Sequence, residues 1–141
     1  MRYKVFIDTN VLLSGIFFEG NESQILDLVE LDLVTSEDVV DELQQVVKKK
    51  LKYLQERTFE IALNEIEKAL TDISIIPRSK YSHKRKEADS LIAHKKDVAI
   101  LAAALYVMPD YFLTGDAHFF TDKVKSVINV LTTQDFLEKI K

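Results

Sequence analysis

The chain has 141 residues, a length that fits one domain covering residues 1–141. Its hydrophobic fraction of 47% and charged fraction of 30% are those of an ordinary globular protein, and the absence of cysteine excludes disulfides and thiolate metal sites. The net charge of −4 excludes a uniformly basic nucleic-acid binder, and no apolar run is long enough for a membrane span or a signal peptide, so we expect a cytoplasmic protein.

Short apolar segments alternate with helical patterns in the first half of the chain. Residues 4–7 are predicted to form a buried strand, because the last three are β-branched or aromatic and the run ends abruptly at an acid. The apolar spacing then predicts a helix over 22–31 and a short strand over 33–35. Ser36 is expected to cap the next helix, whose first turn is acidic as the helix dipole prefers.

The second half continues this alternation and fixes the expected fold class. A helix is predicted over about 51–70, with Ile61, Leu63, Ile66 and Leu70 toward the core, and a strand over 73–76 follows it. The next predicted elements are a helical patch over 87–94 and a helix from Asp97 to about Val107. Strands are then predicted over 111–114 and 127–131, before a last helix to Ile140 that Thr132 or Thr133 caps. Strands that alternate with helices predict a three-layer α/β/α fold with a twisted, mainly parallel sheet.

Two of the predicted strands run into an acid. Residues 5–7 precede Asp8, and residues 111–114 precede Asp116, with one glycine between. Ligands of parallel sheets bind beyond the carboxyl ends of the strands, near the switch in strand order. We therefore expect both acids to lie together at the carboxyl end of the sheet, which we call the rim. Each could instead cap a helix, a role worth about 1 kcal/mol, and the residues alone leave both interpretations open.

Two further acids come from predicted helices. Glu42 lies at the edge of an apolar stripe centred on Leu43, so it is the acid of its helix best placed to reach a cleft; a glutamate in water is the plainer alternative. Asp97 begins an alanine-rich helix that can pack closely on a sheet, and it ranks above Asp89, which has no apolar residues immediately before it. A helix cap is again the alternative for Asp97.

The four acids together predict a metal site. Without cysteine, a metal must be held by oxygen or by one of the histidines at positions 83, 94 and 118, and oxygen-rich sites favour magnesium, manganese or calcium over zinc. Divalent ions can activate water and neutralise a phosphate, as phosphodiester hydrolysis requires. The candidate catalytic and metal-binding residues are Asp8, Glu42, Asp97 and Asp116.

Positive charge is concentrated in residues 78–86, which include no acid. Such a segment could recruit RNA to an otherwise repulsive acidic site, and an aromatic ring within it could stack on an unpaired base. A solvated surface is an equally good interpretation. The candidate RNA-binding residues are Arg78, Lys80, Tyr81, Lys84, Arg85 and Lys86.

Three stretches resemble the PIN domain, specifically the small stand-alone, VapC-like ribonucleases that are toxins of prokaryotic toxin–antitoxin pairs. They are residues 5–12 (VFIDTNVL), 97–104 (DVAILAAA) and 112–116 (FLTGD), and residues 36–43 fit the family's second acidic helix with Glu42 at its acid. The resemblance spans nearly the whole chain in the same order, and the first and last motifs together are fairly specific.

This resemblance implies a magnesium- or manganese-dependent endoribonuclease that binds one or two ions. The implied site has Asp8, Glu42, Asp97 and Asp116 around the metal and Thr9, Asn10 and Thr114 as polar supports. An antitoxin protein and a homodimer are implied as partners. Family members often carry a further acid where this chain has His118, which leaves the number of ions open; His118 could act in proton transfer or simply face solvent.

Other classes fit less well. A phosphatase of the haloacid dehalogenase type needs a second acid two residues after the first, where this chain has Asn10. A receiver domain needs an acidic pair before its first helix, which is also missing. A non-catalytic PIN-like module that binds RNA or protein, and a flap-type DNA nuclease, remain open as alternatives.

Overall fold

Five parallel strands form the centre of the computed structural model, which describes residues 2–51 and 56–140. The order across the sheet is β3-β2-β1-β4-β5, and every pairing is parallel. The expected α/β fold with a parallel sheet is thereby confirmed. The strands are β1 (Tyr3–Ile7), β2 (Leu31–Ser36), β3 (Ser74–Ile76), β4 (Tyr111–Leu113) and β5 (Val130–Leu131).

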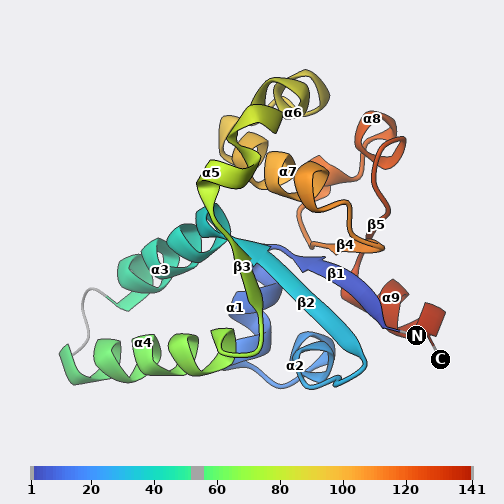
Figure 1. The fold of residues 1–141 in the computed structure, drawn as a ribbon. Helices are drawn as coiled ribbons and strands as arrows, with labels where there is room; N and C mark the ends of the chain where they lie inside the picture. The colour runs from blue at the N-terminus through green and yellow to red at the C-terminus, as the bar shows by residue number, and fades with distance from the viewer. Residues whose placement is uncertain (1, 52–55, 141) are drawn as a thin grey trace.

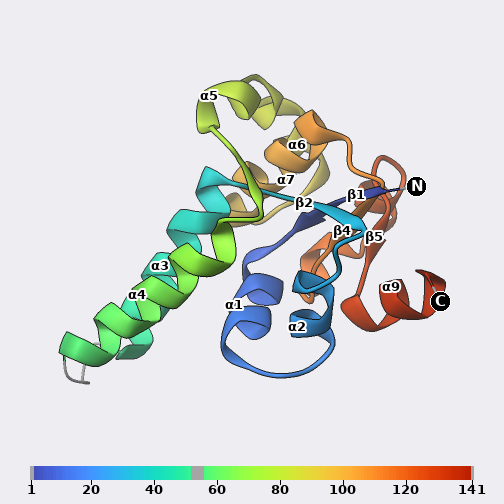
Figure 2. The same ribbon diagram turned by 60° about the horizontal axis from the view of Figure 1, so that its bottom comes forward.

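Helices cover both faces of this sheet (Figures 1 and 2). On one side lie α1, α2 and α9 together with the α3–α4 pair, and on the other lie α5, α6 and α7. This arrangement gives the three expected layers. The helical elements are α1 (Thr9–Phe17), α2 (Asn21–Leu26), α3 (Glu37–Leu51), α4 (Glu56–Leu70), α5 (Arg78–Tyr81), η1 (Ser82–Lys84), α6 (Arg85–Leu91), α7 (Lys95–Val107), η2 (Ala117–Phe119), α8 (Asp122–Lys125) and α9 (Thr133–Ile140).

The central strand β1 sets the register of the site. Its last three residues are fully buried, as expected for a strand with helices on both faces. Phe6 is paired with Phe112 of β4, and their rings stack with centroids 5.3 Å apart. The same register pairs Ile7 with Leu113, so the residues that follow the two strands leave the sheet side by side.

Close packing of α7 places its first turn near the sheet. Its three consecutive alanines, residues 102–104, are buried, and small side chains let a helix approach its neighbours closely. The helix ends at Val107; the next residue, Met108, has a left-handed backbone with φ of 51°, and Pro109 follows. Both features end a helix sharply, so α7 leads directly into β4.

Several element bounds differ from the predictions. The predicted strand over 127–131 is only Val130–Leu131, because α8 and the turn after it use the preceding residues; the amides of Val127 and Ile128 both donate to the carbonyl of Val124. The predicted helix over 22–31 ends at Leu26, because Leu31 pairs with Tyr3 in the sheet.

The predicted helix over 51–70 corresponds to α4, which begins at Glu56; residues 52–55 lie outside the described residues. Ile66 is buried, and Leu63 and Leu70 are partly buried, as predicted. Ile61 is 54% exposed, so its assignment to the core was wrong; Ile66 and the neighbouring Ala62 define the buried face instead. Within the described ranges, none of the helices combines the length and apolar character needed to cross a bilayer.

Candidate active site

The carboxyl ends of β1 and β4 lie at the point where the strand order changes direction. From β1 the chain proceeds to β2 and β3 on one side, and β4 and β5 occupy the other side. Parallel sheets bind ligands at such a switch point, because the loops diverge there and leave a crevice. Asp8 and Thr9 follow β1 at this crevice, and Thr114 and Asp116 follow β4.

Asp8 is an enclosed carboxylate at this rim, with 4% of its surface exposed. Its Oδ1 accepts a 2.7 Å hydrogen bond from the backbone amide of Thr9, and its Oδ2 accepts a 2.6 Å bond from the Thr114 hydroxyl. Burial raises the pKa of Asp8 to about 6, and the charges of Glu42 and Asp97 add to this rise, while the two hydrogen bonds oppose it. The charged form of Asp8 therefore lacks a compensating positive partner.

Glu42 reaches the same region from α3. The buried residues Val39, Leu43 and Val47 hold this helix against the core, and Glu42 lies half-buried beside them. The Thr9 hydroxyl donates a 3.1 Å hydrogen bond to Oε2 of Glu42. Thr9 therefore contacts both acids, Asp8 through its amide and Glu42 through its side chain.

A second group of side chains forms between the starts of α7 and η2. Asp97, the third residue of α7, is only 9% exposed, and its Oδ2 lies 3.1 Å from Nδ1 of His118. Asp116 caps η2 by accepting a 2.9 Å hydrogen bond from the His118 amide, and its Oδ1 also lies 3.0 Å from His118 Nδ1. Burial and the charge of Asp116 raise the pKa of Asp97, and His118 opposes this rise.

The structure thus places the four predicted acids in two coupled groups. The charges of Glu42 and Asp97 act on Asp8, and that of Asp116 acts on Asp97. The carboxylate groups of these four acids lie farther apart than the ligands of a single bound ion would. Among the residues that the structure describes, the set with ligand atoms all within 4.8 Å of one another is His94, Asp97 and His118.

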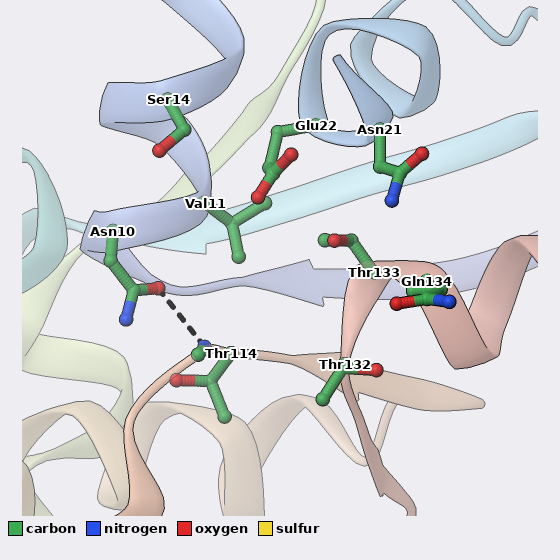
Figure 3. A pocket seen from close by; sticks show the side chains of 10 residues that line it. Asn10, Val11, Ser14, Asn21, Glu22, Thr114, Thr132, Thr133 and Gln134 are labelled. Carbon is green, nitrogen blue, oxygen red and sulfur yellow. Dashed lines mark hydrogen bonds between the residues drawn. The ribbon is translucent and has the colours of Figure 1, made fainter.

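The predicted polar supports join the loops after β1 and β4. Thr9 and Thr114 bond to the acids as described, and Asn10 Oδ1 accepts a 3.3 Å hydrogen bond from the Gly115 amide. A Cβ on Gly115 would lie 3.3 Å from Asn10 Nδ2, so glycine allows this close approach. Beside this contact opens a polar pocket of about 440 Å³ (Figure 3). Side chains that line it include Asn10, Ser14, Asn21, Glu22, Thr132 and Gln134.

Tyr81 does not have the role expected of it. Its side chain is 2% exposed, and its hydroxyl donates to Asp38 of α3, so its ring offers no free face to a base. Arg78 is similarly engaged, because its guanidinium pairs with Asp38 at 3.1 Å and with Asp41 at 2.6 Å. The prediction that Tyr81 stacks on RNA was wrong for this arrangement, because the residue anchors α5 to α3.

The other basic residues of the segment are more accessible. Lys80, Arg85 and Lys86 are exposed, whereas Lys84 lies 3.4 Å from Glu87. Arg85 and Lys86 line a pocket together with Lys95, which sequence reasoning did not single out. Lys95 lies two residues before Asp97 at the start of α7, and the acidic Asp89 lines the same pocket.

His94 was considered only as one of three possible histidine ligands. It is the N-cap residue of α7, and its ring stacks on that of His118 with centroids 3.5 Å apart. The signal in the sequence was the spacing of His94 and Asp97, three residues apart at a helix start. Their approach to His118 depends on the packing of α7 against η2, which residue spacing does not reveal.

Comparison with known proteins identifies the family. The family model described as PIN domain matches residues 6–140, whereas comparison with curated protein sequences gives no significant match. Similar solved structures include FitAcB from Neisseria gonorrhoeae, with a TM-score of 0.71, 18% identity and coverage of 92% of this chain and 98% of that one. VapBC2 from Rickettsia felis, bound to a DNA fragment from its promoter, has a TM-score of 0.66 and 19% identity, again with 92% and 98% covered.

A toxin–antitoxin complex from Klebsiella pneumoniae has the same fold as well, with a TM-score of 0.61, 20% identity and coverage of 92% of this chain and 97% of that one. At these identities the structures support the fold, and the family model, which spans almost the entire chain, supports the family. The chain therefore belongs to the PIN-domain family.

Proposed function

We propose that this protein is a metal-dependent endoribonuclease that hydrolyses RNA phosphodiester bonds as the toxin of a toxin–antitoxin pair, with the whole chain acting as one domain. The observation that carries the proposal is the buried Asp8 at the switch point, surrounded by the charges of other acids. Membership of the PIN family supports a hydrolytic nuclease, and the fold shared with a toxin–antitoxin complex supports the biological setting.

The residues at the rim fit a hard divalent cation. Ionised Asp8 is disfavoured by burial and by neighbouring negative charge, and a cation would reverse both effects. Carboxylates and retained waters are what Mg²⁺ and Mn²⁺ prefer, and we assign the ligands to Asp8, Glu42, Asp97 and Asp116. One or two such ions would supply an activated water and neutralise charge on the phosphate.

The surrounding residues hold these carboxylates in place. The Thr114 hydroxyl donates to Asp8 and accepts a 3.0 Å hydrogen bond from the Asp116 amide, so one side chain orients two acids. Thr9 holds Glu42 in the same way. These bonds orient Asp8, Glu42 and the backbone of Asp116 before RNA binds, and the carboxylates then have to move closer together around the ion.

An acidic rim repels RNA, so a basic surface is needed to bind the phosphates. We assign that role to Arg85 and Lys86 of α6, with Lys80 of α5 beside them, because these side chains are exposed. Lys84 would contribute less, because it lies beside Glu87. Arg78 and Tyr81 would act indirectly, by fixing the segment to α3.

The proposed partners are an antitoxin protein and a second copy of the chain. The fold shared with a toxin–antitoxin complex supports the first. The homodimer follows from the family resemblance. Size-exclusion chromatography with light scattering would measure the mass in solution, and a monomer at micromolar concentration would contradict the homodimer.

A cleavage assay tests the proposed activity. Metal-free protein is incubated with single-stranded RNA or DNA of one sequence, with and without Mn²⁺ or Mg²⁺, and Asp8→Asn is compared with Asp72→Asn. Asp72 is an exposed acid at the amino end of the edge strand β3, whereas the rim lies at the carboxyl ends of β1 and β4. We expect metal-dependent cleavage of RNA that Asp8→Asn lowers by about 100-fold or more and Asp72→Asn leaves unchanged.

Two results would contradict this proposal and favour the alternatives. RNA binding without cleavage under any metal condition would indicate a non-catalytic PIN module. Faster cleavage of DNA than of RNA would indicate a DNA nuclease of the flap type.

A further inference from the structure

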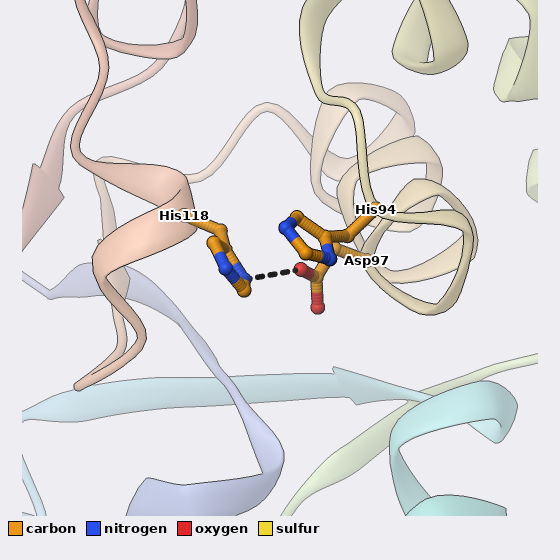
Figure 4. Close-up of side chains that lie close together, drawn as sticks. All are labelled: His94, Asp97 and His118. Atoms are coloured by element: carbon orange, nitrogen blue, oxygen red, sulfur yellow. Dashed lines mark hydrogen bonds and ion pairs between the residues drawn. The ribbon is translucent and has the colours of Figure 1, made fainter.

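Two imidazole rings meet at the carboxylate of Asp97. His94 extends from the start of α7 and His118 from η2, and Figure 4 shows both rings beside that carboxylate. The ring centroids are 3.5 Å apart with an angle of 21° between the planes. Ligand atoms of the three residues all lie within 4.8 Å of one another.

Two contacts in this cluster are as short as those between ligands of one ion. Nδ1 of His118 lies 3.1 Å from Asp97 Oδ2 and 3.0 Å from Asp116 Oδ1. Ligand atoms around a tetrahedral ion with bonds of about 2.0 Å lie roughly 3.3 Å apart, a spacing that His118 and Asp97 already have. The two imidazole rings are stacked with only 21° between their planes, so one ring has to turn out of the stack before both nitrogens can point at one ion. Because His94 and His118 are exposed, their rings can turn without disturbing the core.

A proton on His118 Nδ1 that bridges the two carboxylates is the simpler explanation of these distances. That explanation accounts for His118, but it assigns no role to His94, whose ring covers that of His118. A borderline metal ion accounts for all of the residues, because it takes imidazole nitrogen and carboxylate oxygen together.

We propose that His94, Asp97 and His118, with Asp116 beside them, form a binding site for Zn²⁺ that is separate in composition from the all-carboxylate site for Mg²⁺ or Mn²⁺. Imidazole ligands favour Zn²⁺ strongly over Mg²⁺, and the affinity order of divalent ions places Zn²⁺ above Mn²⁺. A site with two imidazoles and one or two carboxylates therefore selects Zn²⁺ at much lower concentration than the hard ions.

This site would also regulate the proposed nuclease, a consequence that rests on the proposed function. Asp97 and Asp116 belong to both sets of ligands, so an ion held by His94 and His118 withdraws two acids from the activating metal. Zn²⁺ at micromolar concentration is then expected to inhibit cleavage supported by millimolar Mg²⁺. Substitution of His94 should relieve this inhibition.

The test measures metal binding without RNA. Untagged, metal-free protein is titrated with Zn²⁺ by calorimetry and with Co²⁺ by visible absorption, for wild type, His94→Gln, His118→Gln and His83→Gln. The matched control is His83, an exposed histidine whose ring lies 6.0 Å from that of Tyr106. We expect one ion per chain and a loss of affinity of about tenfold or more in the first two variants but not in His83→Gln.

The outcomes separate this inference from the proposed function. Equal affinity in wild type, His94→Gln and His118→Gln would overturn the zinc site, even if RNA cleavage is observed. Conversely, zinc binding that depends on both histidines supports the site even if no RNA is cleaved. Asp8→Asn provides a further check, because it should weaken the response to Mg²⁺ and keep the affinity for Zn²⁺ within about threefold of wild type.

Discussion

The hydroxyl of Thr114 donates a 2.6 Å hydrogen bond to Oδ2 of Asp8 and thereby joins the ends of two neighbouring strands. Both residues are buried, and the same hydroxyl oxygen accepts a bond from the Asp116 amide. Thr114 therefore couples two acids that are far apart in the chain. The consequences of this link can be measured.

Thr114→Val should destabilise the protein by about 1–3 kcal/mol, because it leaves the buried Asp8 carboxyl and the Asp116 amide without their partner. Thr114→Ser keeps the hydroxyl and loses only a methyl group, so it should lose about 1 kcal/mol. Urea unfolding of both variants measures the difference. A valine variant as stable as the serine variant would contradict the role given to the hydroxyl.

Asp8→Asn should raise the melting temperature of the metal-free protein at pH 7.5. The amide has nearly the same shape as the carboxylate and removes a buried charge, whose ionisation is disfavoured by up to about 3 kcal/mol for a pKa of about 6. The same substitution should abolish most of the temperature rise that Mg²⁺ or Mn²⁺ produces in the wild type. Differential scanning fluorimetry with and without metal measures both effects, and Asp72→Asn serves as control. An unchanged metal response in Asp8→Asn would remove Asp8 from the ligand set.

The stability of the metal-free protein should fall as the pH rises through about 6. The folded protein raises the pKa of Asp8 from 3.8 to about 6, so below pH 3.8 both the folded and the unfolded chain hold this proton. Between these values only the folded state keeps it, and stability is lost as the pH rises, by up to about 3 kcal/mol for this group. Asp97, whose pKa is also raised, acts in the same direction. Urea unfolding from pH 4 to 8 with a chelator present measures the slope, which Asp8→Asn should reduce.

Reversing the charge of Arg85 and Lys86 should weaken RNA binding and reduce its dependence on salt. Each phosphate that the protein no longer neutralises lowers the slope of log K against log salt by about 0.7 for a single strand. The double variant Arg85→Glu/Lys86→Glu is compared with Lys68→Glu/Lys139→Glu, which changes the net charge equally at exposed positions elsewhere. Fluorescence anisotropy at several salt concentrations gives the slopes. Equal slopes in the two double variants would exclude this surface as the RNA-binding site.

Tyr81→Phe should lower stability and leave RNA binding unchanged. The variant removes the hydroxyl that donates to Asp38, at a cost of about 1–3 kcal/mol, while the ring remains buried. Burial and the contact with Asp38 also raise the pKa of Tyr81 to about 12, so the hydroxyl stays protonated at ordinary pH. Tyr106→Phe, at a partly exposed ring, is the control and should change stability by less than about 0.5 kcal/mol. A clear loss of RNA affinity in Tyr81→Phe would restore the ring to the binding surface.

Much of the fold follows from local patterns. The apolar run before Asp8 could only be a buried strand, and the Ser36 and Thr132 hydroxyls accept from the amides three residues later, as predicted caps do. The helix α1 was not predicted, because its sequence is apolar on most sides and has no clear period. The bounds of β5 failed for a related reason: a β-branched composition does not distinguish a strand from a buried turn.

The candidate site was only partly predictable. The rim position of Asp8 and Asp116 follows from strand-end geometry, which a sequence with two such strands reveals. The contact of His118 with Asp97 could not be predicted, because it depends on how α7 and η2 face each other across the layers. Tyr81 failed as a stacking residue because a basic, aromatic segment resembles an RNA-binding surface whether or not its aromatic ring is buried.

The pairing of β1 with β4 also has a consequence for synthesis of the protein. Asp8 is translated 106 residues before its partner Thr114, and the acid at position 116 follows two residues later. Until β4 emerges, β1 lacks a neighbour on one side, and the rim has one acid where the finished protein has two. Translation therefore completes the acidic rim last, so an unfinished chain still attached to the ribosome, itself made largely of RNA, does not yet carry the complete site.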